Sequence, residues 1–90
     1  MKDTADVVVK RLVKFEGEGS IKAYCDVAVG EQFLIKGLRV VLGKNGLFVS
    51  MPRQQTKNGK WFDSVETLTK DAKDEVDRVV LDAYQHDSDV

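Results

Sequence analysis

Residues 21–29 read Ile-Lys-Ala-Tyr-Cys-Asp-Val-Ala-Val. The odd positions are all apolar, whereas the even positions carry Lys22, Tyr24, Asp26 and Ala28. A period of two with one apolar face is typical of a strand in an antiparallel sheet, packed on a core on one side only. This stretch therefore predicts a half-buried antiparallel strand, around which the neighbouring segments can be placed.

The next apolar stretch changes phase in its middle. Apolar residues stand at odd positions up to Ile35 and at even positions from Leu38 onward. An uncorrected shift of one residue would turn half of these side chains to the wrong face of the sheet. Glycine inside a strand commonly marks the bulge that corrects such a shift. We therefore predict a β-bulge at Gly37, with Lys36 and Arg39 both directed away from the core.

Turn signals separate further strands. Residues 7–15 are rich in β-branched side chains, and the glycine-containing segment 16–20 predicts a hairpin loop after them. Asn45-Gly46 favours a type I′ hairpin turn, and Pro52 ends the strand that follows. Residues 53–60 are polar and predict a loop or loose hairpin. We expect Trp61 and Phe62 to hold the chain against the body as a short fifth strand.

The pattern changes to a helical period near residue 68. The apolar stripe comprises Leu68, Ala72, Val76, Val79, Val80, Ala83 and Tyr84. Thr67 or Thr69 is the expected N-cap, and Asp74 and Arg78 are spaced to form an i,i+4 ion pair. These spacings predict a helix over about 68–85, followed by a frayed tail, 86–90.

The predicted fold class is α+β: an antiparallel sheet of four to five strands with one C-terminal helix packed on it. We expect a single domain over residues 1–90, with the strands within about 5–63. A 90-residue chain builds only a thin core, and one helix leaves sheet edges open. Both points favour a homodimer formed by strand pairing.

Composition argues against several classes of protein. The chain has one cysteine, which excludes an internal disulfide framework, and no apolar run approaches the roughly 20 residues of a membrane span. His86 is the single histidine, near the expected tail, and Cys25 lies on an apolar strand face. No catalytic constellation and no metal-ligand spacing follow from these residues. We therefore expect a cytoplasmic protein that is not an enzyme, with no cofactor, no metal, no small-molecule substrate and no membrane partner.

The net charge of −1 hides a division along the chain. Residues 1–61 sum to +5 and residues 62–90 to −6. Within the first part, residues 32–62 contain six bases and no acid: Lys36, Arg39, Lys44, Arg53, Lys57 and Lys60. A surface that is merely soluble normally mixes both signs, whereas an acid-free basic surface attracts phosphates. The stretch alone leaves two interpretations open: bases that only solvate a sheet surface, and a surface that binds DNA or RNA.

One segment also resembles a known family. Gly46-Leu-Phe-Val-Ser-Met-Pro52, followed by Thr56, Asn58-Gly59 and Asp63, is similar to the core signature of the SpoVG family. Residues 21–29, 38–41 and 80–84 are also similar to that family. The resemblance implies a small bacterial α+β protein, usually dimeric, that binds DNA and RNA. It further implies a role in regulating septation, sporulation or gene expression.

The basic stretch and the resemblance together predict the site. Arg53, Lys57 and Lys60 are expected to contact phosphates, Lys44, Lys36 and Arg39 to extend the surface, and Lys73 to contribute from the helix start. Gln54, Gln55 and Glu75 depart from the basic pattern of the family and predict weaker or more selective binding. The alternative is a protein-interaction adaptor that acts through its sheet edge and acidic helix.

Overall fold

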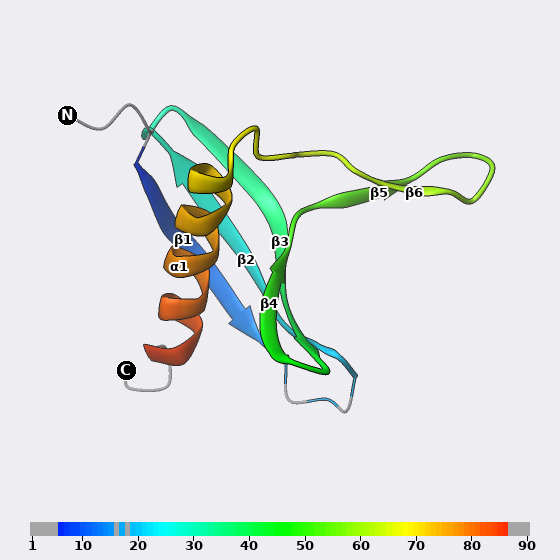
Figure 1. Ribbon diagram of the computed structural model, residues 1–90, viewed down its shortest axis with the longest axis horizontal. Coiled ribbons are helices and arrows are strands. Elements are labelled where there is room, and N and C mark those ends of the chain that lie inside the picture. The colour runs from blue at the N-terminus through cyan, green and yellow to red at the C-terminus, as the bar shows by residue number, and fades with distance from the viewer. Residues whose placement is uncertain (1–5, 16, 18, 87–90) are drawn as a thin grey trace.

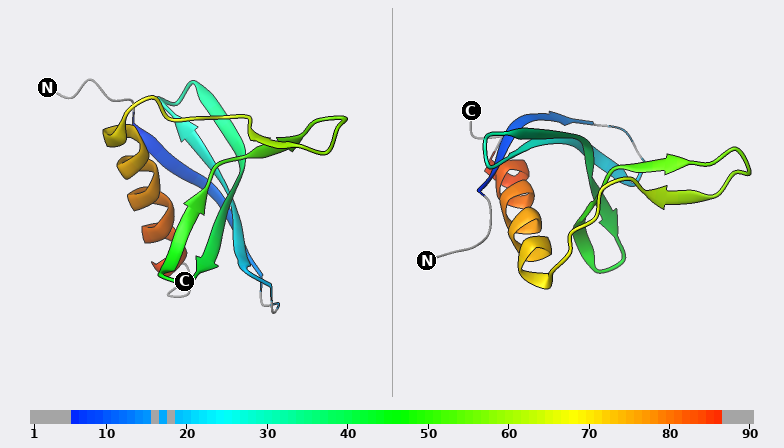
Figure 2. Two further views of the ribbon diagram at one scale, coloured as in Figure 1. Left: turned by 45° about the vertical axis from the view of Figure 1, so that its right-hand side comes forward. Right: turned by 90° about the horizontal axis from the view of Figure 1, so that it is seen from above.

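The computed structural model describes residues 6–15, 17 and 19–86. One antiparallel sheet has the strand order β1-β2-β3-β4, and a separate two-stranded ribbon pairs β5 with β6. The strands are β1 (Val7–Lys14), β2 (Ile21–Val29), β3 (Phe33–Gly43), β4 (Gly46–Ser50), β5 (Arg53–Gln55) and β6 (Trp61–Asp63), and the helix is α1 (Lys70–His86). The predicted α+β class is confirmed, because α1 covers one face of the curved sheet (Figures 1 and 2).

The core lies between α1 and the sheet. Its buried residues are Ala23, Cys25, Val27, Leu38, Val40, Val49, Met51, Val76 and Val80. The alternation predicted for β2 is confirmed, because Ala23, Cys25 and Val27 are at most 1% exposed. The whole sheet consequently has two unlike faces, one packed on α1 and one open to solvent.

The bulge predicted in β3 is confirmed. Cys25 pairs with Leu38 and Val27 pairs with Ile35, so Lys36 and Gly37 together oppose the single residue Asp26. Gly37 has φ +91°, and its N–H donates to Asp26 Oδ1 at 3.2 Å. The extra residue keeps Ile35 and Leu38 on the core side.

The β3–β4 hairpin is confirmed, but its expected turn type is wrong. Gly43 pairs with Gly46, so the two central residues of the turn are Lys44 and Asn45. A type I′ turn requires positive φ at both central residues, and neither has it; the positive φ falls on Gly46 instead. Two successive residues with positive φ occur instead at Gly30 and Glu31, with φ of 59° and 57°, in the turn that the Gln32 N–H closes by donating to the Val29 carbonyl at 3.1 Å.

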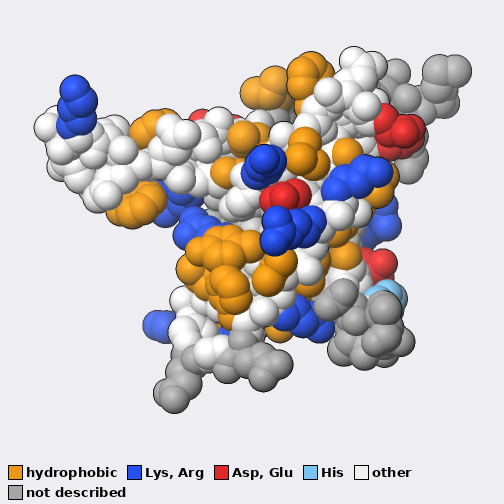
Figure 3. All heavy atoms as spheres, turned by 180° about the vertical axis from the view of Figure 1, so that it is seen from behind, with side chains coloured by type: hydrophobic (Ala, Val, Ile, Leu, Met, Phe, Trp, Pro, Cys, Tyr) orange, Lys and Arg blue, Asp and Glu red, His pale blue; other side chains and the backbone are white. Residues whose placement is uncertain are grey.

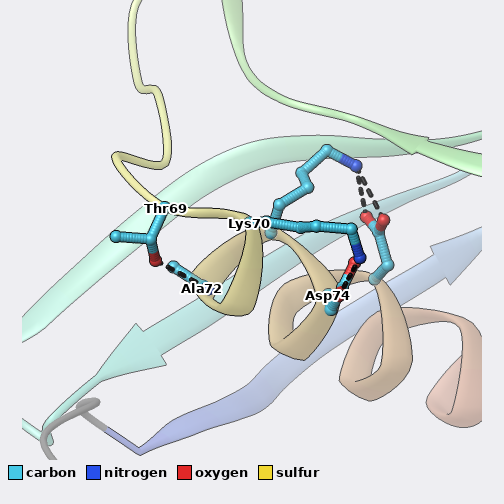
Figure 4. A network of polar contacts seen from close by, with 6 residues as sticks. Thr69, Lys70, Ala72 and Asp74 are labelled. Atoms are coloured by element: carbon cyan, nitrogen blue, oxygen red, sulfur yellow. Dashed lines mark hydrogen bonds and ion pairs between the residues drawn. The ribbon is translucent and has the colours of Figure 1, made fainter.

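The helix begins two residues later than expected. Thr69 is the N-cap, because its Oγ1 accepts the Ala72 N–H at 3.0 Å (Figure 4). Leu68, expected in the apolar stripe, precedes the helix and is 97% exposed. Leu81 packs against the core instead. The helix continues through His86, one residue beyond its expected end, and the rest of the expected frayed tail, 87–90, lies outside the described residues.

The predicted ion pair of the helix is also wrong. Arg78 pairs with Glu75 at 2.8 Å, one helical turn back at i,i−3, and Asp74 pairs with Lys70 at 2.8 Å (Figure 4). Sequence spacing permits either choice, because residues three and four positions apart are both neighbours on a helix surface.

Candidate nucleic-acid interface

The β5–β6 ribbon forms an arm that leaves the body at the end of β4 (Figures 1 and 2). We use "arm" for residues 53–63. Thr56 N–H donates to the Lys60 carbonyl at 2.8 Å, and the Lys60 N–H donates to Thr56 Oγ1 at 3.1 Å. At the base, the Ser64 N–H donates to the Pro52 carbonyl at 2.8 Å. These bonds close the arm at both ends and give it a defined shape outside the core.

The basic residues of the arm differ in their charge environment. Arg53 Nε lies 3.2 Å from Asp63 Oδ1, so part of its charge is balanced. Lys57 and Lys60 are exposed near the tip, and over the described part of the chain no ion pair involves either of them. The positive potential of the arm is therefore concentrated at its outer end.

Trp61 and Phe62 also lie on the arm. They are 56% and 45% exposed, and β6 pairs with β5 and not with the main sheet. The expectation that they hold the chain against the body is wrong. The reason is that the polar segment 53–55 supplies β6 with a partner strand of its own, so neither aromatic ring reaches the core.

Lys36 and Arg39 lie on the face of the sheet turned away from α1, as predicted. Lys36 is exposed at the bulge. Arg39 is half-buried, and its Nη2 donates to Ser50 Oγ at 3.1 Å. Figure 3 shows this face, where hydrophobic and basic side chains lie next to one another and acidic ones are few.

The other two predicted residues lie elsewhere. Lys44 is in the β3–β4 turn, at the opposite end of β4 from the arm (Figure 1). Lys73 is on α1, on the opposite side of the sheet from Lys36. Its Nζ forms an ion pair with Asp77 at 2.7 Å. The seven predicted residues therefore occupy separate surfaces: the arm, the open sheet face, one hairpin tip and the helix.

Sequence reasoning missed Arg11. A register shift between Val9 and Arg11 leaves Lys10 as an extra residue in β1, so Arg11 pairs with Asp26 on the open face while Leu12 faces the core. The sequence alone could not have found it, because apolar residues stand at odd positions (Val7, Val9, Val13) and at even positions (Val8, Leu12) of this stretch alike. Only the pairing of β1 with β2 shows that Val9 and Leu12 face the core and that Lys10 is the extra residue.

Cys25 is a free cysteine and is buried. Burial, and then the nearby Asp26 charge, raises the pKa of the Cys25 thiol from 9.0 to about 11, so the thiol stays protonated at neutral pH. The hydrogen bond that Lys70 Nζ donates to Asp74 Oδ2, and then the Asp74 charge, raise the pKa of Lys70. Within the described ranges, no group of three or more His, Cys, Asp or Glu side chains could hold a metal ion. No helix in the same ranges is long and apolar enough to cross a membrane.

Comparison with known proteins decides the family. The SpoVG family model matches residues 3–86, which is almost the whole chain. This chain belongs to the SpoVG family. A SpoVG relative in Archaeoglobus fulgidus is 41% identical over 81 residues, which cover 90% of this chain and 95% of the relative.

Two further SpoVG relatives are bacterial. The Staphylococcus aureus strain JH9 protein is 34% identical over 80 residues, covering 89% of this chain and 80% of the relative. The Clostridium perfringens strain ATCC 13124 protein is 31% identical over 75 residues, covering 83% of each chain. All three relatives carry the name "Putative septation protein SpoVG". The family resemblance identified from residues 46–63 is thus confirmed.

Proposed function

We propose that this chain is a cytoplasmic, non-enzymatic regulatory protein that binds DNA or RNA as a homodimer. The observation that carries the proposal is the acid-free segment 32–62, because its bases lie on the arm, on the open sheet face and at the β3–β4 turn, and not in the core. Such surfaces release counterions from a phosphate backbone when they bind it. The septation named for its relatives is the process in which we expect it to act.

The arm supplies the phosphate contacts in this proposal. Lys57 and Lys60 lie near its tip, and Arg53 lies at its base beside Asp63. An ammonium group at the end of a projecting ribbon can approach a nucleic-acid backbone without a clash from the body of the protein. Lys36, Arg39 and Lys44 extend the basic surface beyond the arm, while Lys73 would act only if it gave up its partner Asp77.

The adaptor alternative has weaker support. Of the acidic residues on α1, three pair with a Lys or Arg of the same helix: Asp74 with Lys70, Asp77 with Lys73, and Glu75 with Arg78. A fourth, Asp82, has its Oδ1 3.2 Å from His86 Nδ1. The helix surface therefore presents charges of both signs rather than one acidic patch. Two results together would favour the adaptor: the chain binds no nucleic acid, and a protein partner stays bound to it in a pull-down after nuclease treatment.

The test is equilibrium binding to DNA and RNA at several salt concentrations. The double variant Lys57→Gln, Lys60→Gln removes two positive charges and leaves the Arg53–Asp63 pair intact. We expect weaker binding, and the slope of log affinity against log salt should fall by about two for duplex DNA. The matched control, Lys70→Gln with Arg78→Gln, changes the net charge equally on α1 and should keep the slope. Binding that ignores salt, or that falls equally in the control, would contradict the proposal.

A further inference from the structure

The open face of the sheet presents an aromatic ring at its centre. Tyr24 on β2 pairs with Val13 on β1 and with Arg39 on β3, and it is 41% exposed. The Phe15 ring packs against it edge to face, with the centroids 4.8 Å apart and the planes at 80°. The Tyr24 ring is thus held by its neighbours while much of its surface remains open to solvent, as a stacking platform requires.

Charge on this face is strongly one-sided. Arg11, Lys36 and Arg39 come from β1 and β3, and Asp26 is the one carboxylate among the described strand residues directed to this face. A second copy of the same face would bring like charges together, which disfavours self-association. A polyanion that also offers flat apolar rings matches the face in both respects, and nucleic acid has this chemistry.

A hollow of about 230 Å³ opens beside the ring, lined by Arg11, Val13, Tyr24 and Asp26. The Gly37 N–H donates to Asp26 Oδ1 at 3.2 Å, which orients the carboxylate. No ion pair joins Arg11 to Asp26 in the described structure. The hollow therefore offers a guanidinium donor and a carboxylate acceptor next to an aromatic surface.

We infer that this hollow binds one unpaired nucleobase of a single-stranded nucleic acid. The base stacks on Tyr24, the Asp26 carboxylate accepts a hydrogen bond from its exocyclic amino group, and Arg11 donates to a ring or carbonyl acceptor. Lys36 and Arg39 face the adjoining phosphates. A base inside a duplex is stacked and paired on both sides, so it cannot enter the hollow.

This inference rests on the proposed nucleic-acid binding and names its substrate as single-stranded with an unpaired, amino-bearing base. Cytosine has such an amino group, and thymine has a carbonyl oxygen in its place. The hollow therefore favours cytosine over thymine. The arm contributes to the binding of any nucleic acid, because it contacts phosphates. The sheet face contributes only to the binding of an unpaired strand.

The experiment compares oligo(dC), oligo(dT) and a duplex of equal length at one salt concentration. We expect Tyr24→Leu to weaken binding of single strands about tenfold and to leave duplex binding unchanged. Tyr24→Phe keeps the ring and should bind as the unchanged chain does. Asp26→Asn retains an oxygen for the Gly37 N–H, and it should remove the preference for oligo(dC). Equal losses on single strand and duplex, or no loss in Tyr24→Leu, would overturn the inference.

A second measurement keeps the ring and does not depend on how well Tyr24→Leu folds. Trp61 is the single tryptophan of the chain, so Tyr24→Trp in a Trp61→Phe background places one reporter on the sheet face. Its emission should be quenched by oligo(dC) and not by the duplex. Unchanged emission while oligo(dC) binds would reject the hollow but keep the proposed function. If no nucleic acid binds the unchanged chain, the proposed function fails and the inference fails with it.

Discussion

At the residue scale, Gly37 determines which side chains reach the open face. Its positive φ allows Lys36 and Gly37 to occupy the place opposite one β2 residue, so Ile35 and Leu38 both face the core. The bulge also brings the Gly37 N–H to Asp26, the carboxylate of the hollow. One glycine thus connects the packing of β3 with the geometry of the candidate base site.

Gly37→Ala tests this role. A Cβ at position 37 meets no atom within 4 Å, so only the backbone conformation at φ +91° opposes it. We expect the free energy of unfolding to fall by about 1–2 kcal/mol, measured by chemical denaturation. Gly19→Ala is the matched control, since Gly19 also has open space and no positive φ, and it should cost nothing. Equal effects at the two positions would show that the bulge carries no conformational strain.

At the element scale, α1 depends on a cap, on two buried positions and on three ion pairs. Val76 and Val80 are the buried residues of the helix, at 7% and 0% exposure. The three Lys or Arg pairs, to Asp74, Asp77 and Glu75, are on the partly or fully exposed surface, where each contributes little. Packing on the sheet and the N-cap therefore stabilise α1 more than its charges do.

The N-cap gives the sharper prediction. Thr69→Ala removes the oxygen that accepts the Ala72 N–H at 3.0 Å, and an exposed donor is then left to water. We expect a loss of about 1 kcal/mol in the free energy of unfolding. Thr69→Ser keeps an accepting hydroxyl and should restore most of that loss. A Thr69→Ala chain as stable as the original would show that the helix start depends on other contacts.

At the scale of the whole molecule, the sheet ends in two open edges. β1 and β4 each pair with one neighbour in the main sheet, and the ribbon β5–β6 adds a further exposed pair of strands. Unpaired N–H and C=O groups on such edges favour strand addition, and a core of about ten residues gains from a partner. These features support the proposed homodimer.

Sedimentation equilibrium tests the dimer directly. We expect a mass of twice 10.1 kDa at micromolar concentrations, with little change in high salt, because backbone pairing and apolar contact do not depend on screened charges. The Lys57→Gln, Lys60→Gln chain serves as the control and should give the same mass. A single species of 10.1 kDa at all concentrations would contradict the proposal.

The order of elements, the bulge and the family follow from local patterns in the sequence. The alternation at 21–29, the phase change around Gly37 and the helical stripe from Ala72 are periodicities, and burial of one face is sufficient to impose them. The signature at residues 46–63 likewise identifies the family from the sequence alone. The same rule could not find the bulge at Lys10, because apolar residues stand at both odd and even positions of β1 and the register shift follows only from its pairing with β2.

Only the tertiary structure decides which of these elements lie next to one another. Trp61 and Phe62 are apolar by composition, yet they lie on the arm because β5 pairs with β6 and not with the body. Arg11 and Tyr24 are far from each other in sequence, and both lie outside the basic segment 32–62. They line one hollow because β1 pairs with β2. Periodicity shows which face of a strand is buried, whereas strand pairing, a long-range choice, places distant side chains beside one another.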